Sequence, residues 1–190
     1  MEESKKIEGV PQVQILQEGH PLLRSRSQEV TSFDENVAAL AGVMNTVMRG
    51  ANGIGLSAVQ LGIPIRLITI GEGVLREETW ALVNPKIVKR AGEQRTREGC
   101  LSISKGKWWR AIKRSLRVVV EYQDLTGAPQ KVKAHGLLAA ALQHEIDHLD
   151  GVLFTDYVPE EEKKEMAPRT KQYPLINRAA KRAIREANHG

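Results

Sequence analysis

Hydrophobic residues recur every three to four positions around residues 35–50 and 136–150, and this spacing predicts two helices. The first helix is expected to begin at a capping box formed by Ser32 and Glu35 and to run to about Gly50. The second is expected between Gly136 and Gly151, because leucine and alanine favour a helix and a glycine commonly ends one. The apolar face of the first helix would comprise Val37, Leu40, Met44 and Val47.

Between these helices, short runs rich in Val, Ile and Leu predict β-strands. The expected strands are Ile65–Ile70, Ala81–Val88, Leu116–Tyr122 and, after a turn at Asp124–Gly127, one near Gln130–Ala134. One helix, several short strands and a second helix indicate an α+β domain with antiparallel sheet.

The second helix carries the segment His144-Glu145-Ile146-Asp147-His148. Two histidines four positions apart project from one face of a helix, where they can bind one metal ion together. Glu145 lies beside the first histidine, close enough to move protons at a metal-bound water. The spacing favours a hydrolase, although an amphipathic helix that merely contains histidines would also produce it. The inward-packing residues would be Leu138, Ala141, Leu142 and Ile146.

Cys100 is the only cysteine, so the chain forms no intramolecular disulfide and no cysteine pair for a structural zinc site. It follows Gly99, which lets the backbone come close to a ligand. A thiolate and two imidazoles leave a fourth position for water, which is the pattern of a catalytic metal site. A lone cysteine is commonly a small buried thiol, but beside the histidine pair we interpret Cys100 as the third ligand.

Gly53 and Gly55 alternate with other residues at the start of the segment Gly53–Gln60. Alternating glycines suggest tight turns or backbone that lies along a substrate. They do not match a dinucleotide-binding fingerprint, because the third glycine is missing and no strand is expected before them. Taken alone, the segment indicates a turn without chemistry.

In this order, GIGLSAVQ, EGCLS and HEIDH are similar to the three signature motifs of peptide deformylases, which remove the formyl group from nascent N-formylmethionyl peptides. The resemblance extends to His20–Arg24 and Trp80–Pro85 and covers about residues 13–158. It implies an α+β fold with antiparallel or mixed sheets around a central metal-binding helix.

The resemblance also implies a role for individual residues. Cys100, His144 and His148 would be the metal ligands, and Glu145 would be the general acid/base. The catalytic set would be completed by Gln60 and the backbone N–H of Leu101, which would bind the developing oxyanion. Substrate contacts would come from Gly53, Ile54, Gly55, Gly99 and Ala141, and an ion pair between Glu98 and Arg114 would brace the cysteine loop.

The implied reaction is attack by metal-bound hydroxide on the formyl carbon. Glu145 would take the proton of the water and pass it to the leaving amine, which releases formate. The resemblance suggests Fe²⁺ in cells, with Zn²⁺, Ni²⁺ or Co²⁺ in preparations. The donor set accepts all four ions, so it does not name the working one.

Some residues depart from the family pattern. Ser57 stands where alanine is common, and Ser104 replaces a frequent proline. Trp108 and Trp109 lie in a basic loop, where they either cap the substrate groove, touch a partner or pack beneath the loop. Small residues one turn before His144, namely Ala140 and Ala141, would widen the methionine pocket.

Composition is that of an ordinary globular domain: of 190 residues, 41% are hydrophobic and 27% charged. There is no apolar run long enough to cross a bilayer and no signal peptide. A single unpaired thiol suits a reducing compartment. We therefore expect a cytoplasmic protein without membrane attachment.

We expect residues 1–160 to form the catalytic domain and residues 161–190 a basic, helical tail. Its helices would lie near Glu160–Ala167 and Leu175–Ala187, separated by Pro168 and Pro174. A basic, weakly amphipathic helix attracts phosphates. Similar tails in some family members are associated with ribosome contact; the alternative is a solvated helix folded on the domain. The basic residues are Lys163, Lys164, Arg169, Lys171, Arg178, Lys181, Arg182 and Arg185.

Two other classes of protein remain open. A zinc peptidase would share the histidine–glutamate helix, but its third ligand commonly lies downstream, where the chain offers Asp150, Asp156 and Glu160–Glu162 without a peptidase signature. A basic nucleic-acid-binding or ribosome-binding protein with a structural metal is the non-catalytic alternative. Neither explains the glycine-rich and cysteine motifs together.

Overall fold

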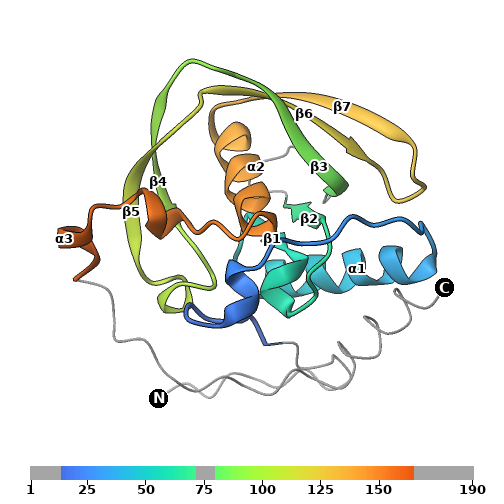
Figure 1. The fold of residues 1–190 in the computed structure, drawn as a ribbon, viewed down its shortest axis with the longest axis horizontal. Coiled ribbons are helices and arrows are strands. Elements are labelled where there is room, and N and C mark those ends of the chain that lie inside the picture. Colours follow the sequence, from blue (N-terminus) through green and yellow to red (C-terminus); the bar gives the residue numbers. More distant parts are fainter. Residues whose placement is uncertain (1–13, 72–79, 165–190) are drawn as a thin grey trace.

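The computed structural model describes residues 14–71 and 80–164. Its central element is α2 (Gly136–Leu149), with β-strands arching over it and α1 (Glu35–Gly50) on the opposite side (Figure 1). The strands are β1 (Gly55–Ser57), β2 (Leu67–Ile70), β3 (Trp80–Ala91), β4 (Gln94–Gly99), β5 (Trp109–Arg114), β6 (Arg117–Gln123) and β7 (Pro129–His135). The shorter helices are η1 (Pro21–Arg24), η2 (Ala58–Leu61), η3 (Ser104–Gly106), η4 (Phe154–Tyr157) and α3 (Glu160–Lys163).

The described strands form two antiparallel sheets. Five strands pair in the order β1-β2-β3-β6-β7, and β4 pairs with β5 in a separate two-stranded sheet. Parallel pairing among the described residues is limited to one isolated bridge between Gln28 and Ile65. The expected α+β class with antiparallel sheet is confirmed.

The first helix begins two residues later than predicted. Its N-cap is Asp34, whose carboxylate accepts hydrogen bonds from the backbone N–H groups of Asn36 and Val37. The predicted capping box of Ser32 and Glu35 is therefore wrong, because the aspartate closer to the helix satisfies the same free N–H groups. The buried face of α1 packs on β1 and β2, with Val37, Ala41, Met44, Met48, Leu56 and Leu67 in one core cluster.

The second helix follows β7 without a loop and occupies the predicted span. Gly136 has a φ of 61°, a left-handed value that suits glycine at the sharp turn from strand to helix. Almost the whole of α2 is buried, including its polar residues Gln143, His144, Glu145 and His148. Buried polar groups require partners, so the buried polar residues of α2 are candidates for a functional site.

The four predicted strands are present as β2, β3, β6 and β7 with shifted ends, but β1 and the β4–β5 hairpin were not predicted. The hairpin sequences, Gln94–Gly99 and Trp109–Arg114, are rich in charged residues that are uncommon in strands. Their pairing is set by contacts far apart in the chain, including the buried Arg114 and Ile112.

The predicted tail helix near Leu175–Ala187 lies outside the described residues, and of the helix near Glu160–Ala167 the structure describes Glu160–Lys163. The proposed division at residue 160 is likewise not tested by the fold. Among the described residues, no helix combines the length and apolarity needed to span a bilayer.

Candidate active site and metal-binding centre

A pocket of about 310 Å³ opens between α2, β4 and the segment that leads into β1. It is lined by most of the residues singled out in the sequence, from segments more than forty positions apart. These are Gly53, Ile54, Gly55, Gln60, Glu98, Gly99, Cys100, Leu101, Ala141, His144 and Glu145. Of the predicted site residues, His148 and Arg114 do not line it, but both lie directly behind it, in contact with Cys100 and Glu98.

The sulfur of Cys100 and one ring nitrogen each of His144 and His148 lie within 4.8 Å of one another. His148 Nε2 is 3.2 Å from Cys100 Sγ. His144 Nδ1 hydrogen-bonds to Glu98 Oε2 at 2.8 Å, which leaves Nε2 as the nitrogen available to the cluster. One thiolate and two imidazoles from buried, fixed side chains fit a divalent metal ion with an open coordination position.

Glu98 is held by two cationic partners. Arg114 donates to both of its carboxylate oxygens, Nε to Oε1 at 2.8 Å and Nη2 to Oε2 at 3.0 Å. Burial alone would raise the pKa of Glu98, but the hydrogen bonds from His144 and Arg114 hold the pKa at about 2. The ion pair expected from the sequence is therefore present, and it fixes the His144 ring at the same time.

The two histidines have opposite electrostatic surroundings. Burial would lower the pKa of His144, but its contacts with Cys100 and Glu98 raise the pKa well above its usual value. Burial and the neighbouring His144 lower the pKa of His148 well below its usual value. His148 is thus neutral, with a nitrogen lone pair ready for a metal. His144 lies between Cys100 and Glu98, where a metal cation bound to its Nε2 would take the place of a proton.

Glu145 is fully enclosed and faces the pocket. Ser57 Oγ lies 2.6 Å from Glu145 Oε2 and 3.0 Å from its backbone oxygen. Burial raises the pKa of Glu145, while His144 and the hydrogen bond from Ser57 oppose that shift. A carboxyl group with a raised pKa is suited to accept and return a proton near neutral pH.

The amide of Gln60 has a fixed orientation. Its Oε1 accepts a hydrogen bond from the backbone N–H of Ser57 at 2.9 Å. Its Nε2 donates to Ser102 Oγ at 3.0 Å and reaches Cys100 Sγ at 3.5 Å. The NH₂ group of the amide therefore points toward the Cys-His-His cluster, where a substrate oxygen would lie.

Sequence reasoning missed two residues that support the site. Ser57 was noted only as a departure from a common alanine, yet its hydroxyl donates a hydrogen bond to Glu145. Asp147 was not assigned a role, although it bonds to Arg114 and to the hydroxyl of Tyr157. The signal for Asp147 was its place between the two histidines of the candidate metal-binding helix, whereas nothing local to Ser57 pointed to a carboxylate far along the chain.

The two adjacent tryptophans have different environments. Trp108 is buried and packs against Phe154 with ring centroids 5.5 Å apart. Trp109 is 47% exposed and lines the pocket, with its ring over Gly99. One of them thus packs beneath the loop, and the other lies at the mouth of the groove.

Fold and site together define the class of protein. A buried Cys-His-His cluster, an adjacent carboxyl group with a raised pKa and a fixed amide donor share one pocket. That combination can bind an ion, activate water and stabilise an oxyanion. These are the functional groups that a metal-dependent hydrolase requires.

Comparison with known proteins identifies the family. The polypeptide deformylase family matches residues 12–164. The peptide deformylase of Wolinella succinogenes is 43% identical over 142 residues, which span 72% of this chain and 82% of the relative. That of Rhizobium meliloti is 46% identical over 142 residues, 73% and 80% of the two chains.

Comparison with solved structures points to the same family. A peptide deformylase from Synechococcus elongatus in complex with actinonin has a TM-score of 0.77 at 37% identity, covering 87% of this chain and 89% of that one. One from Legionella pneumophila has a TM-score of 0.75 at 33% identity, covering 92% and 94%. The chain belongs to the polypeptide deformylase family, and is a metal-dependent hydrolase that removes the N-formyl group from nascent peptides.

Proposed function

We propose that this chain hydrolyses the formamide of N-formylmethionyl peptides with Glu145 as general acid/base and Cys100, His144 and His148 as metal ligands. The observation that carries the proposal is the position of Glu145, buried beside the three ligands and facing the pocket. A divalent ion bound there would lower the pKa of a water molecule and polarise the formyl oxygen.

The side chains would then share the remaining steps. Glu145 takes the proton of the attacking water and returns it to the amine that leaves. Gln60 Nε2 and the backbone N–H of Leu101 donate to the oxygen that gains negative charge; one such donor is typically worth about 3–4 kcal/mol. Ser57 keeps the Glu145 carboxylate in place through its 2.6 Å hydrogen bond.

Edge strands would bind the peptide backbone. β1 ends the five-stranded sheet, and β4 has β5 on one side alone. The pocket is lined by Gly53–Gly55 and Thr96–Gly99. Neighbouring side chains on a strand point to opposite faces of the sheet. A pocket that contacts consecutive residues of β4 therefore lies along the free edge of that strand. An extended peptide can pair with such an edge. The methionine side chain would lie near Ala140, Ala141 and Leu137.

Formate release from N-formylmethionyl-alanine peptides tests the assignment. The protein is prepared without oxygen and loaded with Fe²⁺, Ni²⁺ or Zn²⁺. We expect formate from the wild type and at least a hundredfold less from Glu145→Ala with the same metal content. Cleavage of an internal peptide bond instead, unaffected by Cys100→Ser, would favour the peptidase alternative.

For the metal, we propose Fe²⁺ as the working ion in cells, with Zn²⁺, Ni²⁺ or Co²⁺ occupying the same ligands in preparations. Thiolate and imidazole donors accept all four. A thiolate–Fe²⁺ centre is oxygen-sensitive because both ligand and metal oxidise. Activity that decays in air only in the Fe²⁺-loaded sample would fit the proposal, whereas equal turnover with every ion would not.

We also propose that the basic tail, residues 161–190, contacts the ribosome in the cytoplasm, where nascent formylated chains emerge. The support is its excess of Lys and Arg over acidic residues. Deleting residues 168–190 should weaken co-sedimentation with ribosomes at low salt without changing turnover of a free peptide. Unchanged co-sedimentation would contradict ribosome docking and leave the hydrolase assignment intact.

A further inference from the structure

The charged side chains that line the pocket fall into two groups. Glu98, His144 and Glu145 are buried at its base, where they serve the metal cluster. Arg97 and Lys105 are exposed, and both are cations. The opposite rim, Ala51–Ile54, carries no charge. Among the described residues that line the pocket, the exposed charged side chains are therefore all positive.

Arg97 belongs to a row of residues on one face of the β4–β5 hairpin. Residues directly opposite in an antiparallel pair share a face, so Gly99 with Trp109, Arg97 with Ala111, and Arg95 with Lys113 lie on the same side. The row begins at the pocket with Trp109 over Gly99 and continues outward through Arg97 to Arg95. Within the described part of the chain, neither arginine has an ion-pair partner.

Lys105 is held at the mouth by an unusual backbone. Ser104 and Lys105 have φ values of 47° and 53°, which side-chain-bearing residues rarely adopt. Gln17 braces this loop: its Oε1 accepts from the Lys105 N–H at 3.1 Å, and its Nε2 donates to the Leu101 oxygen at 3.0 Å. The loop thus presents a lysine at a fixed place beside the pocket.

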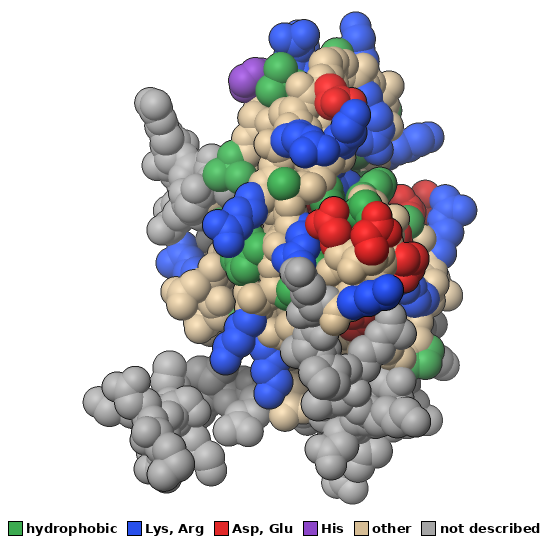
Figure 2. Space-filling view, turned by 90° about the vertical axis from the view of Figure 1, so that its left-hand side faces the viewer, with side chains coloured by type: hydrophobic (Ala, Val, Ile, Leu, Met, Phe, Trp, Pro, Cys, Tyr) green, Lys and Arg blue, Asp and Glu red, His purple; other side chains and the backbone are tan. Residues whose placement is uncertain are grey.

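Acidic groups on this side of the molecule lie elsewhere. Figure 2 shows Lys and Arg spread over the face that carries β4 and β5, with acidic side chains gathered where α3 lies. Glu162 of α3 pairs with Arg110, and Glu93 pairs with Lys113. Neither glutamate neutralises Arg97 or Lys105, so their charge remains available to a ligand.

We propose that the pocket selects formylated peptides with acidic side chains just after the formylmethionine, and that Arg97 and Lys105 recognise these side chains. The inference rests on the proposed function, which places the formyl end at the metal cluster and directs the following residues toward the mouth. A peptide residue opposite Arg97 on the free edge of β4 has its side chain on the same face, about 5 Å away. A carboxylate there meets the Arg97 guanidinium, which has no ion-pair partner among residues 14–71 and 80–164.

The test compares three amidated peptides, formyl-Met-Glu-Glu, formyl-Met-Gln-Gln and formyl-Met-Lys-Lys, at low and high salt. For the wild type we expect kcat/KM to fall in that order, with a threefold to tenfold advantage of Glu over Gln that lies mainly in KM. The advantage should shrink in high salt, because exposed charges are screened. The ratio of kcat/KM for the Glu peptide to kcat/KM for the Gln peptide is taken within each variant, so it does not depend on how much of the protein is folded.

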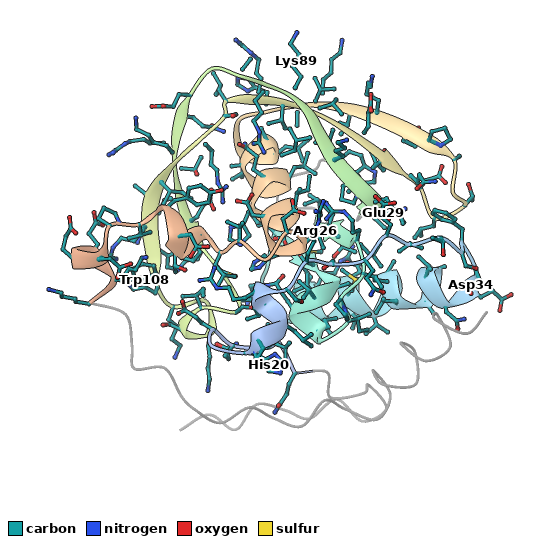
Figure 3. The ribbon with its side chains drawn as sticks, in the orientation of Figure 1. His20, Arg26, Glu29, Asp34, Lys89 and Trp108 are labelled. Carbon is teal, nitrogen blue, oxygen red and sulfur yellow. The ribbon has the colours of Figure 1, made fainter. Side chains whose placement is uncertain are left out.

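Charge reversal identifies the residues. In the double variant Arg97→Glu/Lys105→Glu, the ratio should fall below one. The matched control, Lys89→Glu/Lys133→Glu, changes the net charge equally at exposed sites that do not line the pocket, and should keep the wild-type ratio. Figure 3 shows Lys89 projecting from β3 away from the body of the molecule.

A wild-type ratio of one or less, or an equal ratio in the double variant, would overturn the inference. A ratio of one together with loss of RNA-oligonucleotide binding in the double variant would assign the cations to nucleic acid instead. Formate from no peptide at all would contradict the proposed function itself, and is thereby distinguished from failure of the selectivity.

Discussion

At the residue scale, the site depends on close approaches between side chains that are distant in sequence. A Cβ atom placed on Gly55 would lie 2.5 Å from Glu145 Oε1 and 2.8 Å from Glu145 Cγ. Gly55 is thus required by the Glu145 carboxyl group, the proposed general acid/base, because any side chain at this position would displace it. In the same way, a Cβ on Gly99 would lie 2.6 Å from the Trp109 ring.

Replacing Gly55 with alanine should reduce kcat about a hundredfold, the cost typical of a 1 Å displacement of a reacting group. The added methyl group meets the end of a side chain, so Glu145 moves and the fold survives. Gly42→Ala in α1 is the control, since nothing lies within 4 Å of its added Cβ. Formate release and thermal melting are measured on both. Wild-type kcat in Gly55→Ala would show that Glu145 tolerates displacement.

Replacing Ser57 with alanine should shift the pH profile. The hydroxyl stabilises the ionised carboxylate and opposes the rise in the pKa of Glu145 that burial causes. Without it the pKa rises further, and since a general base works deprotonated, the acidic limb of kcat/KM moves to higher pH. Profiles of the two proteins with the same metal decide this. Superimposable acidic limbs would exclude a role for Ser57 in tuning Glu145.

The candidate metal-ligating residues could be predicted from the sequence because each belongs to a local motif. The residues that hold the side chains of the site in place could not be predicted in this way. His144 and His148 are four positions apart on one helix, a spacing with a direct geometric meaning. The contact of Ser57 with Glu145 joins positions 88 apart, and nothing around Ser57 encodes it. The Glu98–Arg114 pair was found through family resemblance, not through spacing.

At the scale of elements, α2 and the β4–β5 hairpin are joined by one buried cation. Arg114 of β5 bonds to Glu98 of β4 and to Asp147 of α2, and its guanidinium stacks 4.7 Å from the centre of the Tyr157 ring. Only 4% of its side chain is exposed. The hairpin was not predicted because its charged residues resemble those of a loop. The burial of Arg114 and its contacts with α2 stabilise these residues as strands.

Arg114→Met should therefore destabilise the metal-free protein by about 3–5 kcal/mol, because Glu98 and Asp147 would be left without their cation. Lys113→Met is the control, since this neighbour is exposed and pairs at the surface with Glu93; its change should stay within about 0.5 kcal/mol. Urea unfolding at neutral pH measures both free energies. Equal effects of the two substitutions would mean that the buried network contributes little to stability.

At the scale of the whole molecule, the proposed metal ligands come from two parts of the fold, the segment that follows the β4–β5 hairpin's first strand and the helix α2. Cys100 directly follows β4 of the hairpin, and the histidines lie on α2, which packs against the five-stranded sheet. The sequence indicated an α+β fold, but the order of the strands depends on pairings between distant segments, such as β3 with β6. An ion bound by all three ligands would tie both parts together.

Removing the metal should therefore lower the melting temperature as well as abolish activity. Free ion at about 100 times its Kd adds about 2.7 kcal/mol to folding stability. For a domain of this size that corresponds to a shift of roughly 5–10 °C. Melting curves with chelator and with buffered free Fe²⁺ or Zn²⁺ measure the shift.

Cys100→Ser should lose most of this shift, because a hydroxyl is a poor replacement for a thiolate ligand. His135→Ala is the matched control, since this exposed histidine precedes α2 and is not part of the cluster. It should keep the full shift. If chelation left the melting temperature of the wild type unchanged, the ion would not join hairpin and helix, and its role would be confined to the chemistry of the bound water.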